Sequence, residues 1–140
     1  GLRGARVAAF RLQPDLAFAL EGTVCDDTPK EQDISPTTRL GGGPAISLMD
    51  RSFIADRRLV ELLTSTARAQ GIPYQFKQPG VGSTDAGAIH LAGAGVPSVA
   101  VSVPCRYIHG PVSMLSLQDF DHLVALMKAS LKALPAAWQG

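Results

Sequence analysis

Short apolar runs alternate along the chain with longer segments whose apolar residues lie three or four positions apart. The runs predict strands at residues 16–20, 44–49, 74–77 and 99–103. The longer segments, together with two that are rich in small residues, predict helices over residues 1–12, 56–70, 84–94 and 116–134. Strands that alternate with helices indicate an α/β fold, and we expect a three-layer sandwich with a mostly parallel sheet.

Composition and charge limit the class of protein. The 140 residues are enough for one domain with its own core, and 46% hydrophobic against 18% charged residues is typical of a folded, soluble protein. A net charge of +1 without a basic run argues against nucleic acid as a partner, and no apolar stretch reaches the length of a membrane span. Two cysteines do not make a disulfide framework, so we expect a reducing, cytoplasmic location.

Two residues that can bind metal follow predicted strands. Glu21 comes directly after the strand at 16–20, and His109 lies in the loop after the strand at 99–103. Ligands of such sheets bind beyond the carboxyl ends of the strands, and a carboxylate with an imidazole suits Zn²⁺, Co²⁺ or Mn²⁺. Taken alone, a glutamate and a histidine at these places are more often ordinary surface residues.

Seven short blocks, in chain order, resemble those of the tetrahedral (TET) aminopeptidases of the glutamyl and leucyl types. The blocks are residues 19–23, 27–29, 40–46, 71–75, 82–86, 95–97 and 104–111. The last one, Pro-Cys-Arg-Tyr-Ile-His-Gly-Pro, resembles the family's Pro-x-Arg-Tyr-x-His-Ser-Pro. The sequence departs from the family in having Glu21 where aspartate is common and Ser83 where glycine is usual.

This resemblance implies a metallopeptidase that removes N-terminal residues from peptides with water activated by two divalent metal ions (zinc, cobalt or manganese). It implies that Glu21 binds one metal and His109 the other. It also implies a substrate pocket, which we expect to be lined by Ser83, Thr84, Asp85 and Arg106. Intact relatives form dodecamers, so we also expect a homo-oligomer. Some members of the family are described as endoglucanases.

The first five residues, Gly-Leu-Arg-Gly-Ala, resemble the segment that follows an adjacent pair of glutamates in relatives. We therefore expect residues 1–140 to be the C-terminal part of a zinc-peptidase-like catalytic domain. The upstream metal ligands, the catalytic glutamate pair and the inserted dimerisation domain would lie outside this sequence. No catalytic residue is then expected within it, and the chain alone should bind metal weakly and hydrolyse nothing, because a catalytic metal needs about three protein ligands.

Several alternatives stay open. The chain is also compatible with a non-catalytic α/β module that associates with itself, and less well with a glycosidase, which needs two opposed carboxylates. Asp85 is typical of a helix N-cap as well as of a pocket wall, and Arg106 of a residue that holds the His109 loop. Cys25 and Cys105 are expected at the same edge of the sheet, as two free thiols or as a disulfide.

Overall fold

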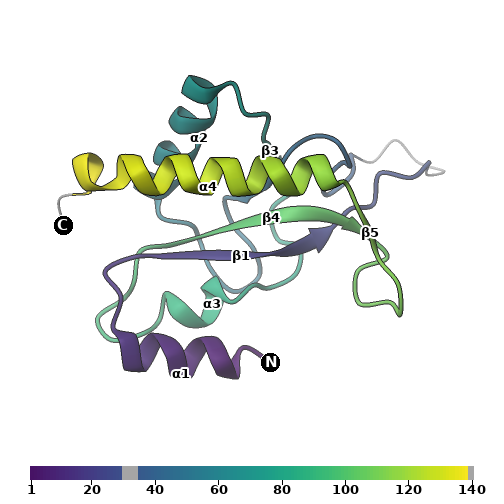
Figure 1. The fold of residues 1–140 in the computed structure, drawn as a ribbon. Helices are drawn as coiled ribbons and strands as arrows, with labels where there is room; N and C mark the ends of the chain where they lie inside the picture. Colours follow the sequence, from purple (N-terminus) through teal and green to yellow (C-terminus); the bar gives the residue numbers. More distant parts are fainter. Residues whose placement is uncertain (30–34, 139–140) are drawn as a thin grey trace.

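The computed structural model describes residues 1–29 and 35–138, which form three layers around a five-stranded sheet (Figure 1). The strands are β1 (Ala17–Val24), β2 (Ala45–Ser47), β3 (Gln75–Lys77), β4 (Ser98–Arg106) and β5 (Met114–Leu115). The helices are α1 (Arg3–Leu12), α2 (Arg57–Gln70), α3 (Ala86–Ile89) and α4 (Leu117–Ala137). Helices α2 and α4 cover one face of the sheet, and α1 and α3 lie on the other (Figure 1). The predicted three-layer α/β fold is confirmed.

The strand order is β1-β4-β2-β3, with β5 paired to β4. Parallel ladders join eight residue pairs of β1 and β4 and three of β2 and β3. Antiparallel ladders join three pairs of β2 and β4 and two pairs of β4 and β5. The sheet is therefore mixed, and its parallel ladders supply most of the pairing. Strand β4 contacts three neighbours, and all of its residues except Arg106 are buried.

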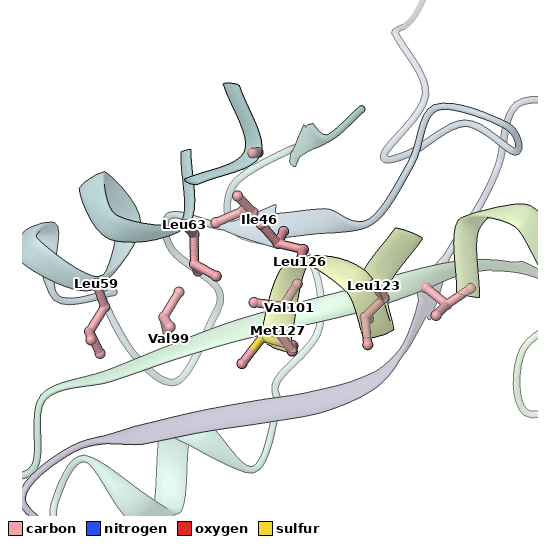
Figure 2. Packing of buried hydrophobic residues seen from close by; sticks show 10 residues of the cluster. Ile46, Leu59, Leu63, Val99, Val101, Leu123, Leu126 and Met127 are labelled. Atoms are coloured by element: carbon pink, nitrogen blue, oxygen red, sulfur yellow. The ribbon is translucent and has the colours of Figure 1, made fainter. Parts of the chain in front are cut away.

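The main core lies between the sheet and helices α2 and α4, where apolar side chains from all three interdigitate (Figure 2). Its members come from one stripe of each helix and from alternate positions of the strands: Ile46, Leu59, Leu63, Ala67, Val99, Val101, Val103, Leu123, Leu126 and Met127. Full burial of each large aliphatic side chain contributes about 1.5–3 kcal/mol. This cluster of ten buried residues is the larger of the two apolar clusters among the described residues, because the second has four.

Local signals set the ends of the two long helices. The Asp56 carboxylate accepts a hydrogen bond from the Arg58 amide at the start of α2, and Gly71 ends that helix in the left-handed region. The Ser116 hydroxyl accepts from the Asp119 amide at the start of α4. Among the described residues, no helix is long and apolar enough to span a bilayer.

Two helices differ from the expectation. Helix α3 was predicted over 84–94 but covers only Ala86–Ile89, and the chain continues in turns in which Gly93 and Gly95 have positive φ angles of 58° and 104°. The backbone of α4 continues to Ala137, past its expected end at residue 134.

Strand β1 forms one edge of the sheet, and within the described residues its outer side has no partner strand. A groove of about 330 Å³ runs beside this edge under α1 and is lined by Leu12, Leu16 and Glu21 among others. A second groove, of about 370 Å³, lies on the other face between β1, β4 and α4 and includes Leu20 and Phe120. An open edge flanked by apolar grooves is typical of a surface that another strand covers.

Candidate functional site

Glu21 lies inside β1 and not after it. We expected the strand to end at residue 20, but its ladder with β4 continues to Val24, and Glu21 is in register with Ser102. The side chain is partly buried and lines a groove together with Asp85 and with Ile89 of α3. There its Oε1 atom accepts a hydrogen bond of 2.8 Å from the backbone amide of Asp85. One oxygen of the carboxylate is thus fixed by the turn before α3.

Opposing effects act on the Glu21 carboxyl group. Partial burial raises its pKa above the usual range, and the nearby charges of Asp85 and Asp50 add to this rise. The hydrogen bond from the Asp85 amide and the positive charge of Lys77 lower the pKa and so oppose the shift. A cation placed next to this carboxylate would favour its ionised form for the same reason that Lys77 does.

Asp50 is a buried carboxylate that the sequence did not single out. Its Oδ1 accepts hydrogen bonds from the Ser52 amide, the Ser52 hydroxyl and the Phe53 amide, and its Oδ2 accepts one of 2.9 Å from the Thr84 hydroxyl. This set of four donors fixes the turn at 80–85 to the segment after β2. The Asp-x-Ser turn itself is a recognisable local signal.

Lys77, at the end of β3, is also buried, with only 4% of its surface exposed. It makes no hydrogen bond or ion pair of standard length with the part of the chain that the structure describes. Burial lowers its pKa, while the charges of Asp50 and Glu21 oppose that change. A methyl group added at Gly82 would lie 3.8 Å from its Nζ atom, so the ammonium group sits beneath the same turn that binds Glu21.

His109 lies in a tight, exposed turn after β4 (residues 107–112). Both Tyr107 and His109 have positive φ angles, 60° and 68°, and the Gly110 amide closes the turn on the Tyr107 carbonyl at 3.0 Å. Non-glycine residues in this region are uncommon and cost on the order of 1–3 kcal/mol each. Figure 1 shows this loop beyond the carboxyl end of β4, on the side of the sheet where α1 and α3 lie. Within the described residues, no hydrogen bond or ion pair joins His109 to Glu21.

Arg106, the last residue of β4, forms an ion pair with Asp27. Its Nε atom lies 2.7 Å from Asp27 Oδ1, and the other carboxylate oxygen accepts from the Leu40 amide at 3.0 Å. The Arg106 hydrogen bond holds the pKa of Asp27 well below its usual range. The Arg106 side chain is thus bound to Asp27, and its expected contact with substrate stays a prediction.

The three remaining pocket candidates lie in one turn but differ in exposure. Ser83 and Asp85 are exposed, whereas Thr84 is buried on Asp50. Asp85 occupies the predicted N-cap position of α3, although its side chain makes no capping hydrogen bond. The backbone amide of Asp85 donates a hydrogen bond to the Glu21 carboxylate.

The two cysteines are neighbours across the β1–β4 ladder, as expected, and both are free and buried. The Cys25 amide donates to the Cys105 carbonyl at 3.0 Å. Cys105 is in register with Val24, so its side chain and that of Cys25 point to opposite faces of the sheet. This alternation explains why the thiols do not pair.

Another buried carboxylate, Asp119 in the first turn of α4, holds the glycine-rich segment before β2. It is only 1% exposed, and it accepts from the Gly41 amide at 2.8 Å and from the Gly43 amide at 2.9 Å. Its own amide also takes part in the cap at the start of α4 by donating to the Ser116 hydroxyl. The contact with Gly41 and Gly43 joins positions more than 70 residues apart, which no local pattern records.

The residues present fit a divalent metal in chemical type but not in number. The Oε2 atom of Glu21 makes no hydrogen bond within the described residues, and the His109 ring is exposed, so a carboxylate and an imidazole are available. In the described ranges, however, no three histidine, cysteine, aspartate or glutamate side chains gather closely enough to hold a metal ion. One carboxylate and one imidazole are fewer protein ligands than a catalytic metal ion usually takes.

Known proteins share this fold. An aminopeptidase from the archaeon Desulfurococcus kamchatkensis is 39% identical with a TM-score of 0.88, over 92% of this chain and 37% of that chain. The TET1 peptidase of Pyrococcus horikoshii, which can assemble into a tetrahedron or a large octahedral shell, is 36% identical with a TM-score of 0.75, over 92% and 36%. A protein of Thermotoga maritima described as an endoglucanase is 30% identical with a TM-score of 0.68, over 89% and 36%.

Sequence comparison agrees with the structures. Curated relatives named as aminopeptidases are 33–42% identical, and the chain spans only 36–38% of their length. The family described as M42 glutamyl aminopeptidase matches residues 1–126 of the 140. Because the family match takes in most of the chain and relatives at 36–39% identity have the same fold, this chain belongs to the M42 glutamyl aminopeptidase family.

Proposed function

We propose that residues 1–140 are the C-terminal part of the catalytic domain of a two-metal aminopeptidase. The observation that carries the proposal is the Glu21 carboxylate, which the Asp85 amide fixes through one oxygen, while the His109 turn follows the carboxyl end of the neighbouring strand β4. Membership of the M42 family supports the same activity. The substrate is then a peptide with a free N-terminus.

In this proposal Glu21 holds one divalent ion and His109 holds the other. Bound metals of this kind polarise a scissile carbonyl and lower the pKa of water. The contribution of this chain is to hold the two ligands. The Asp85 amide orients Glu21 through one oxygen and leaves the other open, and the buried Asp50–Thr84 contact fixes the turn that carries this amide.

The general base and the other metal ligands are proposed to lie outside residues 1–140. A single protein ligand for each ion is too few for tight binding, since catalytic metals take about three. We therefore expect residues 1–140 alone to bind zinc, cobalt or manganese weakly and to show no peptide hydrolysis. Turnover of an aminoacyl anilide by the purified chain with added Co²⁺ would contradict this.

We further propose that the whole protein is a cytoplasmic homo-oligomer. The exposed outer side of β1 and the two grooves beside it support contact with further protein. The relative from P. horikoshii can assemble into closed shells. Size measurement of the full-length protein by light scattering tests the assembly directly.

The central experiment compares metal content and activity in the full-length protein. Variants Glu21→Gln and His109→Gln should each lose about one metal equivalent by mass spectrometry and at least about a hundredfold in release of N-terminal residues, because each removes a ligand. Glu61→Gln, on the exposed surface of α2, is the matched control and should change neither. Full metal content and activity in both ligand variants would show that the site lies elsewhere.

A further inference from the structure

The ion pair between Asp27 and Arg106 is less exposed than the Arg58–Asp56 and Arg57–Glu61 pairs that the structure also describes. The Arg106 Nε atom lies 2.7 Å from Asp27 Oδ1, and the Arg106 side chain is 29% exposed and the Asp27 side chain 10%. The Arg57–Glu61 pair has the same distance, yet its side chains are 90% and 60% exposed. Exposed pairs contribute little to stability, whereas a sheltered, charge-assisted hydrogen bond can fix the position of the groups it joins.

Asp27 connects two segments besides its own. One carboxylate oxygen accepts from Arg106 at the end of β4, and the other accepts from the Leu40 amide in the segment before β2. That segment is held in turn by Asp119 through Gly41 and Gly43. Asp27 is thereby tied to a rigid part of the molecule, and Arg106 is tied to Asp27.

The segment that follows Arg106 needs such an anchor. Tyr107 and His109 both have positive φ angles, and the turn has one internal hydrogen bond, from Gly110 to Tyr107. Side chains disfavour this backbone conformation, so the turn keeps it only if its ends are held in place. Arg106 is the residue directly before the first of the two strained positions.

We propose that Asp27 is a positioning residue, which acts through Arg106 to hold the strained turn that presents His109. The role of His109 as a metal ligand rests on the proposed function, but the mechanical link from Asp27 to the turn does not. In this view the Asp27 carboxylate touches neither metal nor substrate. It sets where the His109 imidazole stands relative to Glu21.

Hydrogen exchange of the full-length protein, freed of metal, tests the mechanical link independently of metal binding. In Asp27→Asn, the Gly110 amide should exchange about ten- to a hundredfold faster, while the Val101 and Leu126 amides in the core keep their protection. Arg106→Lys, which retains the charge, should raise the exchange rate of the Gly110 amide less than Arg106→Gln does. Glu61→Gln, which removes the exposed pair of equal length, should leave the turn unchanged.

Two results from Asp27→Asn alone would overturn the proposal. One is a Gly110 amide that exchanges at the wild-type rate in Asp27→Asn. The other is an equal acceleration at Gly110 and Val101, which would make the pair a general stabiliser of the fold. A double variant gives a further check: Asp27→Asn combined with Arg106→Gln should loosen the turn no more than Arg106→Gln alone, and additive effects would also refute the link.

The full-length protein separates this inference from the proposed function. If both hold, Asp27→Asn should lower metal content from two equivalents toward one, because the His109 site weakens while the Glu21 site remains. If the wild-type protein binds no metal, the proposed function fails, and the exchange result at Gly110 still decides the positioning role. A different result would be that Asp27→Asn keeps two metal equivalents while its Gly110 amide exchanges faster than in the wild type. That result would show that the turn does not position His109 for metal binding, and it would overturn this part of the proposal.

Discussion

Replacement of Asp119 by alanine should be among the most damaging single changes in this chain. The carboxylate is 1% exposed and accepts hydrogen bonds from the Gly41 and Gly43 amides at 2.8 and 2.9 Å. Alanine would leave both amides without their acceptor, and the Gly43 amide lies in a buried contact. Such donors cost free energy because water does not replace the lost partner.

The magnitude follows from these two contacts. A hydrogen bond to a charged group contributes about 1.5–3 kcal/mol, and loss of a negative charge from the first helical turn costs about 0.3–1 kcal/mol more. Partial access of water to the Gly41 amide offsets some of this, so we expect Asp119→Ala to lower the free energy of unfolding by about 3–5 kcal/mol. Asp119→Asn keeps one acceptor and should lose about half as much.

Urea unfolding followed by circular dichroism at pH 7 measures these differences. Asp121 lies two residues further along α4 and is exposed, so Asp121→Ala makes the same chemical change without the two amides. It should alter the unfolding free energy by less than about 0.5 kcal/mol. If Asp119→Ala and Asp121→Ala were equally stable, the carboxylate would not be holding the glycine-rich segment.

Three further outcomes are expected. Leu63→Ala, at a fully buried position, should cost about 2–5 kcal/mol in the same unfolding assay. Gly41 and Gly43 both have positive φ, but only at Gly43 would a side chain collide with the Pro73 carbonyl. Gly43→Ala should therefore destabilise the fold clearly more than Gly41→Ala, which meets only the backbone penalty of about 1–2 kcal/mol. Equal melting temperatures of the two variants would contradict this. The folded state lowers the pKa of Asp27, so the ionised carboxylate stabilises the fold fully at a pH above the unfolded-state pKa of about 3.9. This stabilisation declines as the pH falls below that value. Between pH 7 and pH 3, the wild-type protein should therefore lose more unfolding free energy than Asp27→Asn.

Sequence patterns located the elements whose limits are local. Helix α2 was predicted within one residue, because Asp56 caps it and Gly71 ends it in the left-handed region. The end of β1 was missed, because Glu21 and Gly22 look like the start of a loop, and only their pairing with β4 keeps them in a strand. The two-residue β5 was missed for the same reason, since it exists through its contact with β4.

The sequence likewise indicated some features of the candidate site and left others undetected. Glu21 and His109 were singled out because their side chains carry recognisable chemistry at strand ends. The donor that fixes Glu21 is the backbone amide of Asp85, which leaves no mark in the sequence. The partners Asp27 and Arg106 are 79 residues apart, and a distance of that kind is settled by the fold and not by spacing.

The central place of β4 has a consequence for synthesis on the ribosome. β1 pairs only with β4 in the described structure, and their first paired residues are Ala17 and Ser98. At about 5–20 residues per second, β1 would wait roughly 4–16 seconds before its partner is made. During that time the side of β1 that pairs with β4 has no partner, which favours pairing between nascent chains. Chaperones that shield extended segments during synthesis should therefore raise the yield of folded protein. Their effect should exceed that of substitutions that slow the unfolding of the completed fold.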